Sequence, residues 1–471
     1  MLYTLVIVLS LSVATLYLLG QPWRNGWAKL GVGTLTWSQR LTYAFGVATV
    51  ISAVILLVVN YRKQTLAENS AFVERFGAAA DQLGHTAPAV RIAGVFAMSA
   101  LADEYAQHRQ QVIDVLCGYM RLPYAPASRD MAVSEVVQEA TWPGATGSRS
   151  EQRRYVLRPF DREVRATIVR VFRDRLREGA PISWRGYSLD FTEATFDAAD
   201  FSGAHFAGRV SFERATFPTG STSFDDAVFS DGLVSFNEAH FSGARISFGF
   251  AEFTGARVSF DGVTLSNGEL SFAGISLEAG RISFNGAHFS GTDVFIGADF
   301  LGADLLFAGA HFSNGRVKFA GPDVSKGEVS FAQSTFSGGE LIFEKPDISS
   351  GLHFLMARFT GSRVRFVDAK LRGMLSFYAC EFSNGTISLE DAEISDGRLI
   401  FDQARFDGAT ISLRGSRSSG GLTTFSGATL SRGVVDFTDG TYPEGTLAVS
   451  ASTLPSTVIQ LPAGFAPIEG D

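Results

Sequence analysis

A phenylalanine or another large apolar residue recurs at regular intervals between Phe212 and Phe437. Of the nineteen intervals that separate these positions, sixteen are twelve residues long and three are eleven. A second apolar position follows each of them five residues later, with Ser418 as the one polar occupant. Repetition this regular over most of the chain's second half predicts a solenoid of short similar units and excludes an irregular globular core.

The repeated unit reads [VIL]-S-F-x-x-A-x-F-S-x-G-x, as in VSFNEAHFSGAR at residues 234–245. Within V-x-F and A-x-F the first and third residues point to the same side, as in a short extended segment. Glycine-containing corners turn the chain between these segments. Four short faces then close one coil of 24 residues, and roughly eleven coils stacked about 4.8 Å apart give a rod about 50 Å long. The phenylalanines fill its interior as stacked columns.

One position interrupts this pattern. Placing Phe295 inward would also place Asp293 inward, because the two residues share one side of an extended segment. Burying an unpaired carboxylate costs several kcal/mol, so we expect Val294 and Ile296 to point inward instead. Ile296 also preserves the spacing of twelve from Phe284.

Cysteine content and charge limit the chemistry of the chain. Two cysteines, Cys117 and Cys380, exclude a disulfide scaffold, a CxxC redox pair and a thiolate zinc cluster. Residues 1–187 hold 21 Lys and Arg against 14 Asp and Glu, whereas residues 188–471 hold 19 against 34. A basic front and an acidic back indicate two modules with different partners.

Residues 1–63 are predicted to form a membrane anchor with two transmembrane helices. Residues 2–19 and 41–59 contain no charged residue, and each run is close to the length that crosses a bilayer. The linker between them carries three tryptophans, which suit the headgroup region. A signal peptide is the alternative for the first run, but a basic leading segment and a small-residue cleavage site are absent. Two spans place both termini on one side of the membrane, and we favour the cytoplasmic side for the large domain.

Residues 64–121 form a helical segment similar to one helix pair of a HEAT or armadillo array, with a polar break at His108–Gln110. Residues 122–157 read as a linker. Residues 158–187 contain an amphipathic helix whose apolar stripe, from Val164 to Leu176, is expected to cap the first coil, since an open coil end exposes strand edges. Its many arginines fit either a solvated face or a face for anionic lipid or nucleic acid. Residues 443–471 read as an extended tail.

Residues 188–442 resemble the pentapeptide-repeat family, whose consensus is A-[DN]-[LF]-x-x. The first units, from Leu189 to Phe206, repeat every five residues as [AL]-x-F-x-x, and the later ones resemble a twelve-residue tandem variant with extra corner residues. The resemblance implies a right-handed quadrilateral β-helix. The front of the chain, with Arg75-Phe76, Gln82-Leu83-Gly84 and Val90–Ala102, resembles a common bacterial arrangement of two spans preceding such repeats. This second resemblance implies a multi-pass protein of the bacterial inner membrane.

Motifs for catalysis or cofactor binding are absent: the sequence contains no P-loop, GxSxG or HExxH, and we expect no catalytic residue, cofactor or bound metal. His288 and His311 should be stacked neighbours, but two histidines alone rarely hold a metal. The better candidate is a column of carboxylates. Asp299, Asp323 and Asp347 are spaced 24 residues apart and should occupy successive coils. With Glu252 two coils below, they form a candidate partner-binding stripe for arginine or a cation. The alternative is that these carboxylates are polar only because outward-facing positions are exposed to water.

The predicted function is that of a non-enzymatic, membrane-tethered scaffold whose rigid acidic rod binds a protein partner, expected to be basic. The alternative comes from the resemblance: quinolone-resistance pentapeptide proteins are acidic rods that mimic DNA and bind type II topoisomerases. An enzyme would need a cleft with convergent polar groups, which a filled β-helix does not offer. The acidic rod does not favour direct nucleic-acid binding, and the bilayer is the expected second partner.

Overall fold

The computed structural model describes residues 36–126, 135–144, 147–156, 160–218, 220–449 and 459–462. Its contacts divide the chain into two units, residues 1–78 and residues 79–471, which are described separately here. The first predicted membrane span, residues 2–19, lies outside the described residues.

Helix α2 (Trp37–Gly84) contains the second predicted span, residues 41–59. The segment Phe45–Gly84 includes a stretch with a mean hydropathy of 1.8 and is, by length and composition, able to cross a membrane. Apolar side chains such as Val50 and Leu57 are exposed along it, as on a helix surface that faces lipid. Of the two predicted spans, the described residues therefore contain one candidate.

Three further helices precede the β-structure: α3 (Pro88–Glu104), α4 (Arg109–Met120) and α5 (Asp161–Leu176). A short 3₁₀ turn, η3 (Ala106–His108), separates α3 from α4 close to the predicted polar break. Gly94 lets α3 approach the last turn of α2 closely, because a Cβ at Gly94 would lie 2.6 Å from the backbone nitrogen of Leu83.

Two strands, β1 (Glu135–Gly144) and β2 (Gly147–Val156), occupy the segment interpreted above as a linker. They pair antiparallel from Glu135↔Val156 to Gly144↔Gly147 and join no other described strand. Gly144 and Gly147, two of the residues that suggested a linker, form the last register pair of these strands.

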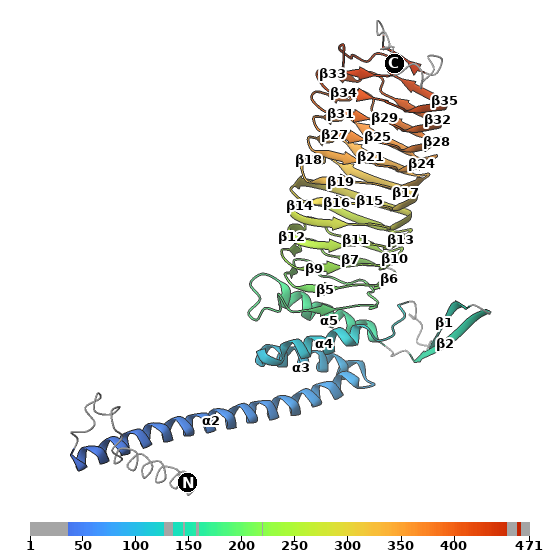
Figure 1. The fold of residues 1–471 in the computed structure, drawn as a ribbon. Coiled ribbons are helices and arrows are strands. Elements are labelled where there is room, and N and C mark those ends of the chain that lie inside the picture. The colour runs from blue at the N-terminus through green and yellow to red at the C-terminus, as the bar shows by residue number, and fades with distance from the viewer. Residues whose placement is uncertain are drawn as a thin grey trace. The chain divides into compact units, whose positions relative to one another are not determined.

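From Leu189 onward the chain forms one parallel β-solenoid (Figure 1). The strands of its first half are β3 (Leu189–Asp190), β4 (His205–Phe206), β5 (Arg209–Ser211), β6 (Thr216–Phe217), β7 (Ser221–Ser223), β8 (Val228–Phe229), β9 (Leu233–Ser235), β10 (His240–Ser242), β11 (Arg245–Ser247), β12 (Glu252–Ser259), β13 (Thr264–Ser266), β14 (Glu269–Ser283), β15 (His288–Leu301), β16 (Asp304–Leu306), β17 (His311–Ala320), β18 (Asp323–Lys326) and β19 (Glu328–Ser330).

The strands of the second half are β20 (Thr335–Ser337), β21 (Glu340–Glu344), β22 (Asp347–Ile348), β23 (Gly351–His353), β24 (Arg358–Thr360), β25 (Arg363–Val367), β26 (Lys370–Leu371), β27 (Met374–Ser376), β28 (Glu381–Ser383), β29 (Thr386–Ser388), β30 (Glu393–Ile394), β31 (Arg398–Ile400), β32 (Arg405–Ser412), β33 (Arg417–Ser418), β34 (Leu422–Thr424), β35 (Thr429–Asp436), β36 (Leu447–Ala448) and β37 (Ile459–Gln460).

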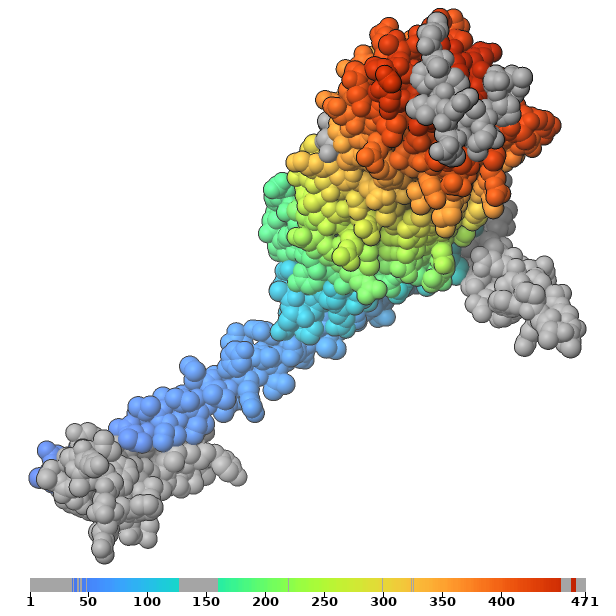
Figure 2. Space-filling model, turned by 45° about the horizontal axis from the view of Figure 1, so that its top comes forward, coloured from blue at the N-terminus to red at the C-terminus, as the bar shows by residue number. Residues whose placement is uncertain are grey.

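Strand register confirms a coil of about 24 residues. Val210 pairs with Val234, Phe217 with Phe241 and Ile246 with Leu270, each 24 residues apart. Together with the Phe229↔Phe253 column, these pairs mark four strand columns, one for each face of the coil. About eleven turns follow one another. In Figure 2 the colour bands succeed each other in chain order, as expected where each coil contacts only its neighbours.

The phenylalanine columns fill the interior as predicted. Every predicted aromatic position from Phe212 to Phe437 is buried except Phe295. Rings of successive coils stack face to face: Phe331 lies 4.7 Å from Phe307 and 4.9 Å from Phe354, centroid to centroid. At the two-residue corners the second residue adopts a left-handed backbone, with φ of 53° at Arg214.

Helix α5 covers the first coil. Val164, Ile168 and Phe172 are fully buried. The ring of Phe172 meets that of Phe191, the first phenylalanine of the solenoid, edge to face at a centroid distance of 5.2 Å. Just after α5, Arg177 forms an antiparallel bridge with Ala204. The helix thus closes the end at which interior rings and strand edges would otherwise be exposed.

A buried charged cluster fixes α5 to the other helices. Asp161 is 6% exposed and accepts a hydrogen bond of 2.7 Å from Nε of Arg165 and another from the hydroxyl of Tyr119. Arg91, 1% exposed, lies 3.8 Å from the same carboxylate. Arg165 also donates to the backbone oxygen of Met120, so the cluster joins the start of α5 to the end of α4.

The solenoid continues past residue 442, where the sequence analysis placed an extended tail. Strand β36 pairs with β34 at Thr423↔Leu447, and β37 pairs with β35 at Val435↔Ile459. The aromatic repeat ends before these strands. Backbone pairing does not require phenylalanine, and the buried side chains of Leu447 and Ile459 fill the inner side instead.

Candidate functional site

The predicted acidic stripe lies in one strand column. The register pairs Asp299 with Asp323 and Asp323 with Asp347. Glu252 belongs to the same column, because it pairs in register with Ser276, and Ser276 pairs with Asp299 in the next coil. The four residues named by the sequence analysis therefore share a face of the solenoid, and their role in binding stays a prediction.

The last member of this stripe is already paired. Arg372 donates from its Nε to Oδ1 of Asp347 over 3.1 Å and forms a second hydrogen bond from the same guanidinium. The next rung, Lys370, is also basic. Asp347 is therefore less available to an external cation than the spacing alone suggested.

A different strand column carries a row of charged side chains of both signs, here called the charged row. Register pairs connect its members from coil to coil, and each directly precedes a buried apolar residue. The charged row consists of Arg245, Glu269, Asp293, Arg316, Glu340 and Arg363.

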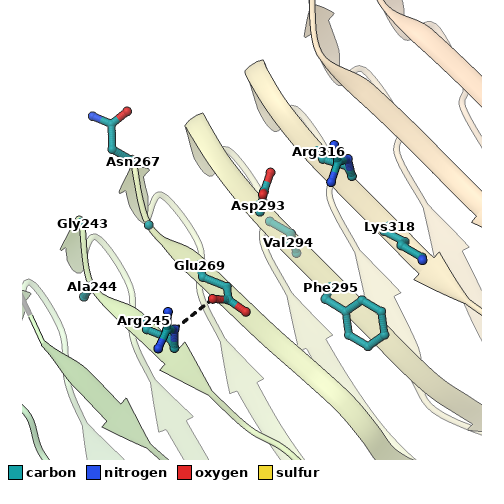
Figure 3. Close-up of a pocket in the computed structure, with 11 residues that line it drawn as sticks. Gly243, Ala244, Arg245, Asn267, Glu269, Asp293, Val294, Phe295, Arg316 and Lys318 are labelled. Carbon is teal, nitrogen blue, oxygen red and sulfur yellow. Dashed lines mark hydrogen bonds and ion pairs between the residues drawn. The ribbon is translucent and has the colours of Figure 1, made fainter.

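Part of the charged row lines a groove of about 520 Å³ on the outer surface of the solenoid (Figure 3). Its charged side chains come from strands β11, β14, β15 and β17, on four successive coils. Lys318 and Phe295 complete one side, and the corner residues Gly243 and Asn267 lie at the other. The groove is therefore a surface built by stacking, with two or three residues from each coil.

Four of the five charged side chains in this groove form ion pairs with other coils. Nε of Arg245 donates to Glu269 over 3.0 Å, the contact drawn in Figure 3. Arg316 lies 3.8 Å from Glu340, outside the groove. Nζ of Lys318 lies 2.9 Å from a carboxylate oxygen of Glu344. Asp293 is exposed and forms no ion pair within the described part of the chain.

Phe295 faces outward beside Asp293, as the sequence analysis predicts. Val294 and Ile296 are 2% and 1% exposed, whereas the ring of Phe295 is partly exposed. The register pairs Phe295 with Ser271 below and Lys318 above. Alternation along β15 thus places an aromatic ring where the repeat carries serine, and Ile296 takes the place of a phenylalanine in the interior column.

In the sequence, this irregularity predicts the inward side chains but not the groove, because the groove depends on which neighbouring charges pair across coils. The available signal was the replacement of an outward serine by Phe295, two residues after an acidic residue.

Histidines of two coils lie against each other on another face. The rings of His288 and His311 stack with their centroids 4.8 Å apart. Within the described residues, no three His, Cys, Asp or Glu side chains are grouped closely enough to hold a metal ion.

Both cysteines are free and buried. Burial raises the pKa of the Cys380 thiol to about 12, and it raises the pKa of Cys117 above its usual range as well. Since the thiolate is the nucleophilic form, neither residue has the character of a catalytic cysteine.

We expect both thiols to react slowly with Ellman's reagent at pH 8. A thiol pKa near 12 lowers the thiolate fraction of Cys380 about a thousandfold relative to an ordinary cysteine. The absorbance of released thionitrobenzoate should therefore rise slowly in the native chain and quickly after unfolding in guanidinium chloride. A fast reaction of either thiol in the native state would contradict the buried placement.

Comparison of the sequence with models of known protein families, and with curated proteins, finds no match.

Proposed function

We propose that this protein is a non-enzymatic scaffold, tethered to a membrane, whose β-solenoid binds a protein partner through the groove around Asp293 and Phe295. The observation that carries the proposal is an exposed carboxylate with no ion pair among the described residues, next to a partly exposed aromatic ring on a rigid surface. Exposed aromatic side chains beside charged groups are typical of protein-binding surfaces. The partner is expected to be basic, since the free charge in the groove is negative.

The repeat unit supports membership of the pentapeptide-repeat family in its twelve-residue tandem variant, with a right-handed quadrilateral β-helix. Four strand columns per coil and the phenylalanine ladder are the features that favour this assignment. On the same basis, the front of the chain is proposed to be a two-span anchor in a bacterial inner membrane, with the repeat domain in the cytoplasm. Helix α2 is the part of that anchor that the described residues support.

The distribution of charge favours a protein-binding scaffold over the DNA-mimic alternative. Double-stranded DNA carries only negative charge along its backbone. In the charged row, Arg245, Arg316 and Arg363 interrupt the carboxylates at short intervals, and ion pairs join neighbouring coils. Such a row presents a specific pattern to one partner surface instead of a uniform negative field.

The proposal is tested by chemical crosslinking of the tagged full-length chain in the membranes of its native cells. We expect a crosslinked complex that is lost when Asp293→Asn and Phe295→Ser are combined, because both groups contact the partner. Glu328→Gln is the matched control, since Glu328 is an exposed carboxylate of another strand column and belongs to neither the groove nor the acidic stripe. A complex that survives in the double variant, or is lost equally in the control, would show that binding lies elsewhere.

A further inference from the structure

Asp293 and Phe295 present two different recognition groups on one strand. With Val294 pointing inward, both side chains leave the same side of β15, about 7 Å apart along the strand. Figure 3 shows both of them on the groove side of the strand. A carboxylate and a ring at this separation can be bridged by one flat cationic group that pairs with the first and stacks on the second.

The charged neighbours of Asp293 are paired with other residues. Glu269, its register partner in the coil below, is paired with Arg245. Arg316, its partner in the coil above, is paired with Glu340, and Lys318 is paired with Glu344. The basic residues of the groove are thus engaged, and the Asp293 carboxylate is left to an external cation.

Among cationic side chains, arginine fits this arrangement best. Its guanidinium is planar, forms two parallel hydrogen bonds with a carboxylate, and stacks on aromatic faces, whereas the lysine ammonium is a strongly hydrated point charge. Gly243 carries no side chain at the corner that bounds the groove, which leaves room next to Asn267 for the backbone of an extended peptide beside the strands.

We propose that the groove is an arginine-binding site, in which the guanidinium of a partner's arginine pairs with Asp293 and stacks on Phe295. This inference rests on the proposed function and specifies the partner: a protein with an exposed arginine in an extended segment. It also moves the expected arginine contact from the acidic stripe to a different strand column.

The test uses the full-length chain in nanodiscs and two small probes, N-acetyl-arginine amide and its neutral isostere N-acetyl-citrulline amide. Saturation-transfer difference NMR should detect binding of the arginine probe and at least tenfold weaker binding of the citrulline probe. Asp293→Asn should weaken the arginine probe about tenfold, and Phe295→Ser about two- to fivefold. Phe295→Trp should retain binding, because its ring also stacks on a guanidinium. Glu328→Gln, outside both the groove and the acidic stripe, should leave it unchanged.

Equal transfer to both probes, or undiminished arginine binding in Asp293→Asn, would overturn the inference. Its failure is distinguishable from that of the proposed function. If Asp293→Asn abolishes probe binding while the membrane complex persists in the double variant, the arginine site stands and the docking function fails. If the crosslinked complex is lost in the double variant but the arginine probe binds Asp293→Asn as tightly as the unmodified chain, the docking function stands and the arginine site fails.

Discussion

Replacing Phe331 by alanine should lower the free energy of unfolding by about 3–5 kcal/mol, the range measured for buried phenylalanines in other cores. The Phe331 ring is fully buried and stacks between Phe307 and Phe354, so its removal leaves a cavity that three coils line. Rigid backbone pairing between the coils limits collapse around that cavity. Urea unfolding of the detergent-solubilised full chain, followed by circular dichroism of the strands, measures the change.

Phe295→Ser is the matched control for this prediction. The same residue type is removed, but Phe295 lies on the outer surface, where the repeat ordinarily carries serine. The free energy of unfolding should change by less than about 1 kcal/mol. Similar losses for the two variants would mean that the rings inside the solenoid are not its stabilising core.

Asp161→Asn should destabilise the helical cap by about 3–5 kcal/mol, because a buried ion pair is costly to break from one side. Asparagine retains the size of the side chain but removes the negative charge that faces Arg165 and Arg91, both almost fully buried. The fluorescence of Trp184, which lies against Phe172 of the cap, should report unfolding at lower urea concentration than in the unmodified chain.

Glu381→Gln provides the comparison for this second variant. Glu381 also forms an ion pair, with Nε of Arg358 at 3.0 Å, but both partners lie on the solvent-exposed surface. Its loss should cost less than about 1 kcal/mol, since water screens exposed pairs. If Asp161→Asn proved equally mild, the cluster would not be what holds α5 against α4.

The period of the solenoid could be predicted because each coil repeats the same pattern of inward apolar and outward polar residues. The V-x-F alternation determines which side chains point inward, so one sequence predicts the buried columns and even the outward position of Phe295. The hairpin β1–β2 could not be predicted in this way. Its strands carry no repeat and join no other strand of the described residues, and glycines such as Gly144 and Gly147 are equally typical of a linker.

The candidate site was less predictable than the fold. Register alone places Asp299, Asp323 and Asp347 in one column, but pairing between side chains decides which carboxylates stay free. Arg372 reaches Asp347 from a position two residues beyond its register partner Lys370. Such contacts depend on the conformations of long side chains, and these conformations cannot be predicted from the spacing of residues along the sequence.

Site-specific photocrosslinking from position 295 tests the central claim, docking of a basic protein on the groove, most directly. With p-benzoylphenylalanine in place of Phe295 in the full-length chain, irradiated native membranes should yield one adduct with a basic protein. Adding Asp293→Asn should abolish that adduct. The same probe in place of Tyr378, an exposed aromatic residue of a corner outside the groove, should not produce it. No adduct from position 295, or the same adduct from both positions, would contradict the account.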